Sequence, residues 1–127
     1  MLNLKYVFNF TKCGHLCLVY IFKKYKVINK CKYNKNYLSL QEIRDILESN
    51  NFNCITFKTN KLEELETNTG YLTLIKASSS YHYIIILKYN KDYIYYYDPL
   101  YLFTRKVRLK AFLKRWTGIC LSFSYIL

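Results

Sequence analysis

Three short fragments, far apart in the chain, each carry a side chain able to take part in covalent chemistry. Cys13 lies in the run Thr11–Cys17, His82 lies between two tyrosines, and Asp98 stands directly before a proline. A thiol is a nucleophile, an imidazole can take up its proton, and a carboxylate can orient the imidazole. If the fold brings the three side chains together, they could cleave an amide bond.

Cys13 is expected at the start of a helix. The apolar stripe that includes Leu16, Val19 and Phe22 predicts a helix over residues 14–25, with Cys13 just before it or in its first turn. The free N–H groups and the dipole at that end would favour a thiolate. The alternative is that Cys13 is a small buried hydrophobic residue, as most free cysteines are.

His82 and Asp98 flank a predicted hairpin. Residues 81–89 and 93–97 have the composition of strands, and residues 90–92 form a turn cluster. The strand after His82 is apolar on both faces, which predicts a central position in a sheet.

The length of the turn decides whether His82 and Asp98 meet. A three-residue loop pairs Ile84 with Asp98 and makes His82 a diagonal neighbour on the same face, whereas a turn centred on Asn90 places the two directly opposite. A two-residue turn would put Asp98 on the other face. The alternative is a solvent-facing His82 and an Asp98 that only starts a turn before Pro99.

The remaining elements predict an α+β fold. Ser39 and Glu42 form a capping box that opens a second helix, which ends at residues 50–51. Further strands are expected at residues 54–57, 71–76, 103–107 and 119–126, with helical turns at 60–63 and 111–115. Helices come first and strands follow, which indicates N-terminal helices packed on a C-terminal antiparallel sheet.

Length and composition bound the organisation of the chain. Its 127 residues, of which 52% are hydrophobic, are enough for one core, so we expect a single domain over residues 1–127. The apolar run Leu16–Phe22 is much shorter than the roughly 20 residues that a membrane span needs. We therefore expect a cytoplasmic protein that does not span a membrane.

The five cysteines have no framework spacing and are odd in number, which favours reduced thiols. Cys13 and Cys17 could share a helix face, but a metal site there would need two more ligands. His15 is near, yet it points in another direction. We expect neither a metal nor a cofactor.

The formal net charge of +12 raises the possibility of an anionic partner. The lysines are nevertheless scattered among Asn, Tyr and Ile, and no compact basic arm is present. Nucleic-acid binding is therefore kept as an alternative, and the preferred interpretation has no nucleic-acid partner.

At this point several motifs resemble one family. The run Cys13–Leu18 resembles the nucleophile segment of the bacteriocin-processing cysteine peptidase domains, which stand at the N-terminus of ABC exporters and also occur alone. The other matching segments, in the same order, are His82–Leu87, Asp98-Pro99, Phe112, Trp116–Gly118 and Leu121. Each motif is weak by itself, and the four in order are fairly specific over nearly the whole chain.

The resemblance implies a papain-like fold and cleavage of a leader peptide after a double-glycine motif, releasing a bacteriocin or signalling peptide. Cys13 would be the nucleophile, His82 the general base and then acid, and Asp98 the residue that orients His82. The partners would be a precursor peptide with its leader and a separate ABC exporter at the inner face of the membrane.

The chain departs from the family pattern at the oxyanion site. The family carries a Gln six residues before the nucleophile, where this chain has Val7; Asn9 is the nearest amide and the candidate oxyanion residue. Lys12 replaces the usual acidic residue, and the segment between the first helix and Cys54 is shorter than in the family. These departures keep open a second reading, a weakened or inactive domain that binds leader peptides on the same scaffold.

Overall fold

The computed structural model describes residues 4–31, 37–66, 70–77 and 80–126, and within the first helix it describes side chains from Lys12 onward. The helices are α1 (Leu4–Tyr25), α2 (Leu40–Ser49), the 3₁₀ turn η1 (Leu62–Glu64) and α3 (Leu109–Leu113). The strands are β1 (Phe52–Lys58), β2 (Tyr71–Ala77), β3 (Ser80–Tyr89), β4 (Tyr93–Asp98), β5 (Phe103–Arg108) and β6 (Trp116–Tyr125).

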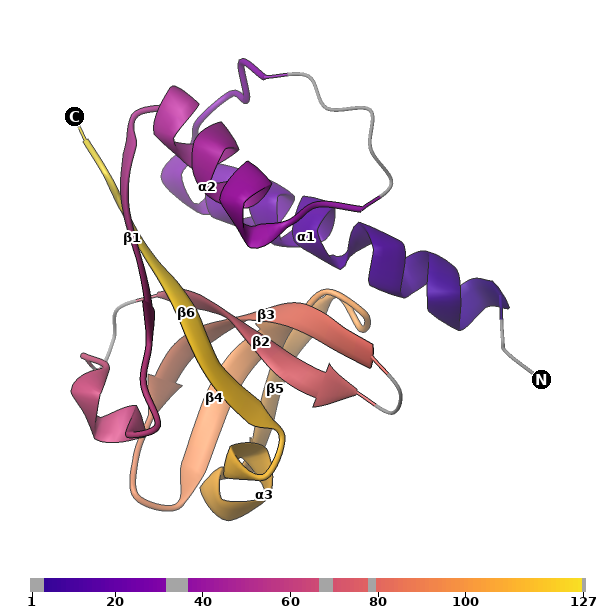
Figure 1. Ribbon diagram of the computed structural model, residues 1–127, viewed down its shortest axis with the longest axis vertical. Coiled ribbons are helices and arrows are strands. Elements are labelled where there is room, and N and C mark those ends of the chain that lie inside the picture. Colours follow the sequence, from indigo (N-terminus) through magenta and orange to yellow (C-terminus); the bar gives the residue numbers. More distant parts are fainter. Residues whose placement is uncertain (1–3, 32–36, 67–69, 78–79, 127) are drawn as a thin grey trace.

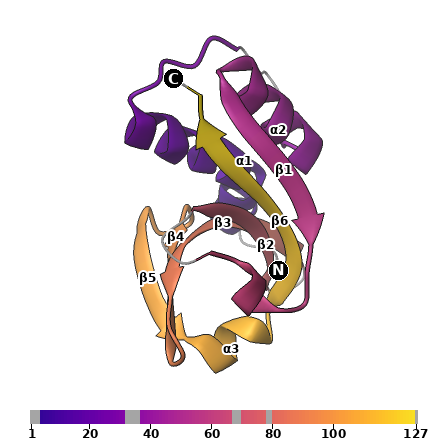
Figure 2. The ribbon, with the colours of Figure 1, turned by 90° about the vertical axis from the view of Figure 1, so that its left-hand side faces the viewer.

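The strands form one six-stranded antiparallel sheet in the order β1-β6-β2-β3-β4-β5. Helices α1 and α2 lie side by side above one face of this twisted sheet, and α3 lies at the opposite end of the molecule (Figures 1 and 2). The predicted α+β architecture is confirmed, as is the interior position of β3. None of the described helices is long and apolar enough to cross a membrane.

Helix α2 begins where the sequence predicts. The Ser39 hydroxyl accepts a hydrogen bond from the Glu42 amide at 3.1 Å, and the Glu42 carboxylate accepts one from the Ser39 amide at 3.0 Å. This reciprocal pair satisfies two N–H groups that have no partner within the helix. Ile43, Ile46 and Leu47 then turn toward the core.

The sheet carries a core on each face because its side chains alternate. In β3, Ile85 packs in the cluster beneath α1 and α2, while Ile84 and Ile86 pack in the cluster on the opposite face, with Phe112 of α3. Burial on both faces is what an interior strand requires, and it explains the uninterrupted apolar run of β3.

Two element boundaries differ from the predictions. Helix α1 begins at Leu4 rather than at Gly14, so Cys13 lies within the helix. Strand β6 begins at Trp116 rather than at residue 119, and α3 is displaced toward the N-terminus to Leu109–Leu113. Long-range contacts extend β6: Trp116 pairs with Ile75 of β2, a partner 41 positions away that local sequence does not reveal.

Candidate active site

The hairpin of β3 and β4 sets the position of His82 relative to Asp98. Near the turn, Tyr89 pairs with Ile94, a register that would place Asp98 and His82 on opposite faces of the sheet. A β-bulge between Ile86 and Lys88 then shifts the register by one residue.

Beyond the bulge, Ile86 pairs with Tyr96 and Ile85 with Tyr97. This is the register that a three-residue loop gives, and it places Asp98 on the same face as Ile84 and His82. The extra residue at the bulge therefore changes which face of the sheet Asp98 occupies. Bulges beside functional sites often redirect a side chain in this way.

His82 and Asp98 meet in the protein interior. The His82 Nε2 atom lies 3.6 Å from the Asp98 Oδ1 atom, and each side chain is at most 2% exposed. The separation is longer than a hydrogen bond in a closed complex, as is common in sites without substrate. At this distance the carboxylate can orient the imidazole and stabilise its charged form.

Two further groups hold the Asp98 carboxylate. The Leu100 amide donates a hydrogen bond to Oδ1 at 3.0 Å, and the Arg105 Nη1 atom lies 3.8 Å from Oδ2. Arg105 is one of many basic residues near the C-terminus, and no local motif marks it. The signal lies in the pairing of β4 with β5, where Arg105 faces Tyr96, and not in any local motif.

Cys13 approaches strand β3 from α1, in the cluster that also contains Tyr83 and Ile85. Its sulfur accepts a hydrogen bond from the backbone amide of Tyr83 at 3.4 Å, so the thiol lies against the residue that follows His82. Gly14 allows this approach: a Cβ there would lie 3.2 Å from Ile43 Cδ1 and 3.4 Å from Tyr83 Cδ2, tighter than ordinary packing. The structure therefore brings the helix carrying the thiol onto the strand carrying the imidazole.

The expected activation of Cys13 by the start of a helix is wrong, because α1 begins at Leu4. Burial raises the pKa of the Cys13 thiol, while the backbone N–H groups of Tyr83, Gly14 and Cys13 itself act to lower it. The charge of Asp98 also contributes to raising this pKa. The thiol and the carboxylate thus lie within electrostatic reach of each other.

The hollow at Cys13 is almost closed. It has a volume of about 10 Å³ and is lined by Cys13, Gly14, Tyr37, Leu38, Leu74, Tyr81 and Tyr83. Tyr37 and Tyr81 are largely exposed at its rim. A hollow of this size holds at most about one water molecule, so a peptide could enter only if these side chains moved.

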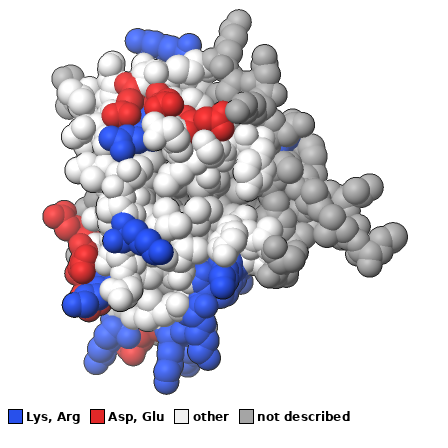
Figure 3. All heavy atoms as spheres, in the orientation of Figure 1, with Lys and Arg blue, Asp and Glu red and all other residues white. Residues whose placement is uncertain are grey.

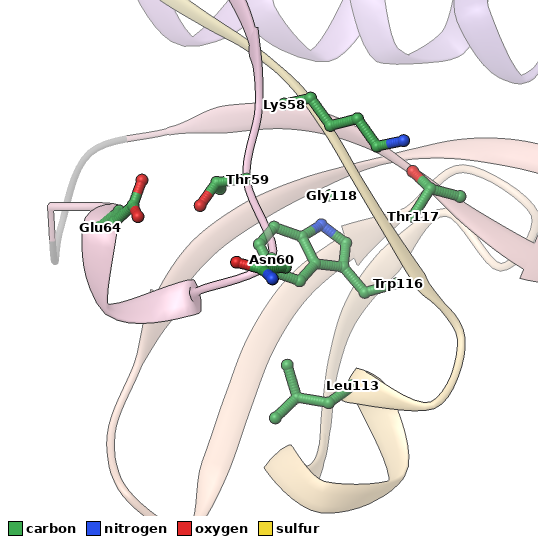
Figure 4. Close-up of a pocket in the computed structure, with 8 residues that line it drawn as sticks. All are labelled: Lys58, Thr59, Asn60, Glu64, Leu113, Trp116, Thr117 and Gly118. Carbon is green, nitrogen blue, oxygen red and sulfur yellow. The ribbon is translucent and has the colours of Figure 1, made fainter.

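A larger hollow lies elsewhere, between the end of β1, η1 and the start of β6 (Figure 4). It has a volume of about 590 Å³ and is lined by Lys58, Thr59, Asn60, Glu64, Leu113, Trp116, Thr117 and Gly118. None of the described residues that line it is a cysteine, histidine or aspartate.

The structure does not test two other expectations. Val7 and Asn9 lie in α1, but their side chains are outside those described, so the oxyanion candidate remains a prediction. Within the described part of the chain, no group of three or more His, Cys, Asp or Glu residues could hold a metal ion.

Comparisons with known proteins agree with this fold. A model of the peptidase C39 family matches residues 4–125. No curated protein sequence matches the chain.

Three crystal structures have the same fold. One is a double-glycine motif protease from an AMS/PCAT transporter in complex with the leader peptide (TM-score 0.77, 18% identity, 91% of this chain and 86% of that chain). The others are the peptidase domain of Streptococcus ComA (TM-score 0.70, 17% identity, 91% and 92%) and an N-terminal C39-like domain from Vibrio parahaemolyticus (TM-score 0.72, 11% identity, 90% and 97%). Because the family model spans nearly all of the sequence, the chain belongs to the peptidase C39 family.

Proposed function

We propose that this protein is a cysteine peptidase that removes leader peptides after a double-glycine motif, with Cys13 as nucleophile, His82 as general base and acid, and Asp98 as the residue that orients His82. Residues 1–127 would act as a single peptidase domain. The observation that carries the proposal is the buried contact of His82 with Asp98 at 3.6 Å, beside a thiol bound to the next amide along β3.

The proposed chemistry uses the two ring nitrogens of His82 for different partners. Since Nε2 of His82 faces Asp98, Nδ1 would take the proton of the Cys13 thiol. The thiolate attacks the carbonyl carbon, a C–S bond forms, and the C–N bond breaks as His82 returns the proton to the leaving amine. Water, deprotonated by His82, then forms a C–O bond to the acyl carbon, and the C–S bond breaks to restore the thiol.

The closed hollow supports glycine next to the scissile bond. A volume of about 10 Å³ between Tyr81, Tyr83 and Leu38 leaves little room for a side chain beside the Cys13 sulfur. Residues without side chains would fit with the least rearrangement. The AMS/PCAT protease that shares this fold acts at a double-glycine motif and was crystallised with its leader peptide, which supports the same substrate class here.

The proposed partners are a precursor peptide and a separate ABC exporter. The C39 domain of Streptococcus ComA belongs to a bifunctional ABC transporter, which motivates this pairing. The protein would then act in the cytoplasm, beside the exporter.

A cleavage assay tests the proposal. A synthetic precursor with an acidic leader ending in two glycines is incubated with the wild type, Cys13→Ala and His82→Ala, and the products are identified by mass spectrometry. Each substitution should lower the cleavage rate by about 10³-fold or more, because each removes a group that moves a proton or forms a bond. Circular dichroism verifies that the variants remain folded.

The matched control is Cys17→Ala, which removes a fully buried thiol one helical turn away. It should retain cleavage if only Cys13 reacts. Unchanged cleavage by Cys13→Ala would refute the proposed peptidase.

A second candidate function is leader binding without cleavage. The raised pKa of the buried Cys13 thiol and Val7 at the position of the family's Gln favour it. Removal of one oxyanion donor typically slows catalysis by about 10²–10³-fold.

Alkylation by iodoacetamide near neutral pH separates the two functions. Fast labelling of Cys13 in preference to the more exposed Cys31, slowed in His82→Ala, supports the peptidase. Slow and unselective labelling, together with binding of the intact precursor, supports the binding domain.

A further inference from the structure

The turn between β4 and β5 exposes three consecutive apolar side chains. Tyr101 is 52% exposed, Leu102 is 65% exposed and Phe103 is 55% exposed; we call these three residues the apolar tip. A contiguous exposed apolar group of this kind usually marks an interaction site, whereas single exposed apolar residues need no explanation.

The backbone of the apolar tip strengthens this argument. Leu102 has a φ of 57°, in the left-handed region that favours glycine or asparagine. The turn is nevertheless fixed, because the amides of Tyr101 and Leu102 donate hydrogen bonds to the Asp98 carbonyl at 3.1 and 2.9 Å. A branched apolar residue that is both exposed and in this conformation does not serve the stability of the fold, so a contact with a partner is the better explanation.

Cations of α1 border the apolar tip. Val19, Lys23 and Lys24 line one side of a shallow hollow of about 490 Å³, and Leu102 and Phe103 line the other. The helix and the hairpin are joined below it by the stacked rings of Tyr20 and Tyr97, whose centroids are 4.2 Å apart. The lysines and the apolar tip therefore belong to one continuous surface.

Acidic side chains are absent from the segments that build this surface. Residues 1–41 and 99–127 contain no Asp or Glu. The carboxylates lie instead in and around α2, η1 and the β3–β4 hairpin, and Asp98, at the base of the turn, is buried. In the view of Figure 3, acidic side chains gather over α2 and η1, while Lys and Arg dominate the end of the molecule that carries α3.

We propose that the apolar tip and the lysines of α1 dock on an anionic membrane surface. The apolar tip would enter the interface, where aromatic side chains are favoured, and Lys23 and Lys24 would contact lipid phosphates. A projecting apolar group with flanking cations suits insertion into a lipid surface. A peptide ligand would instead be expected in a groove that encloses it. Because the turn begins at Asp98, docking holds the candidate active site next to the bilayer.

This proposal goes beyond the peptidase function and does not depend on it, since Cys13→Ala should bind membranes as the wild type does. The test is co-sedimentation of the full chain with vesicles of phosphatidylcholine containing about one third phosphatidylglycerol, at about 0.1 M salt. Pure phosphatidylcholine vesicles are the reference. We expect binding only to the anionic vesicles.

Two variants localise the contact. The double variant Lys23→Gln/Lys24→Gln should weaken binding by about thirtyfold, because each cation near the lipid surface contributes about fivefold. Leu102→Asn should weaken it by about threefold or more through loss of apolar burial. Asparagine tolerates a positive φ, so the fold should be retained.

Matched controls are Lys58→Gln/Lys61→Gln near η1 and Ile55→Thr on β1, where Ile55 is 59% exposed. Equal binding to neutral and anionic vesicles, or equal losses in the controls, would overturn the proposal. A third result would also overturn it. If Leu102→Asn weakened binding of a synthetic acidic amphipathic peptide but left vesicle binding unchanged, the surface would be a peptide site.

Discussion

The Asp98 carboxylate lies between two nitrogen-bearing side chains of different exposure. His82 is buried on one side, while Arg105 is 34% exposed on the other and also lies over the ring of Tyr101, 4.9 Å from its centroid. A partly exposed ion pair contributes little to stability, about 0–1 kcal/mol. Its effect should therefore be seen in the chemistry of the site more than in the fold.

Arg105→Gln should lower kcat/KM at neutral pH by less than about tenfold and change the free energy of unfolding by no more than about 1 kcal/mol. Arg105 contacts the carboxylate from its exposed side, and the Leu100 amide still holds Asp98 when the guanidinium is removed. The measurements are kcat/KM with the double-glycine precursor and urea unfolding.

The matched control is Arg108→Gln. Arg108 lies on the same strand but over the ring of Tyr93, 5.6 Å from its centroid, on the other face of the sheet from Asp98. An equal fall of kcat/KM in both variants would show a general effect of charge rather than a contact with Asp98.

Buried thiols should make the protein less stable at alkaline pH. Burial raises the pKa of Cys54 to about 11, with the charge of Glu48 adding to this effect and that of Arg44 opposing it. Burial also raises the pKa of Cys17 and Cys120. In the unfolded chain a thiol loses its proton near pH 8.5, whereas the buried thiols of the folded protein keep theirs to higher pH. Deprotonation therefore stabilises the unfolded state relative to the folded state as the pH rises.

The expected stability is full below about pH 8.5 and falls as the pH rises toward 11. Urea unfolding at several pH values measures the free energy of unfolding. Cys54→Ala should lower the free energy of unfolding at neutral pH. It should also reduce the fall of this free energy between neutral and alkaline pH. Cys31→Ala, which removes a thiol outside the core, should keep the slope of the wild type.

At the scale of elements, close backbone contact decides how the edge of the sheet is built. Gly118 has a φ of 81°, and a Cβ there would collide with the Thr59 carbonyl oxygen. The Thr59 amide in turn donates a hydrogen bond to the Gly118 carbonyl at 3.0 Å, which fixes the end of β1 to β6. Glycine is required at this position because both the conformation and the space exclude a side chain.

Gly118→Ala should destabilise the protein by about 3 kcal/mol or more, from backbone strain combined with the displaced contact to Thr59. The free energy of unfolding in urea gives this value. Gly70→Ala is the control: its Cβ would meet only the ring of Phe123, at 3.1 Å, and Gly70 lacks the positive φ. A loss of less than about 1 kcal/mol for Gly118→Ala would contradict the argument.

The charge of the whole molecule makes a separate prediction. A net charge of +12 should give weak binding to oligonucleotides that falls steeply with salt and does not depend on base sequence. Fluorescence anisotropy with two unrelated oligonucleotides at several salt concentrations measures both properties. Tight, sequence-dependent binding that persists at high salt would instead support the nucleic-acid alternative.

The sequence by itself determined the type and order of nearly all elements. The capping box at Ser39 and Glu42, the turn at residues 90–92 and the apolar run of β3 are local signals, and the structure agrees with each. The antiparallel α+β architecture followed from them, because alternation and capping depend on neighbours along the chain. The same local motifs supplied Cys13, His82 and Asp98 as candidates.

Only the tertiary structure decided which contacts these side chains make. The bulge beside Leu87 restores the pairing that brings Asp98 to the face of His82, and Gly14 lets α1 approach Tyr83 closely enough for Cys13 to accept its amide proton. The burial of the thiol and the contact of Arg105 with Asp98 likewise arise from packing between elements. Such contacts depend on packing and register across the whole sheet, which no local pattern encodes.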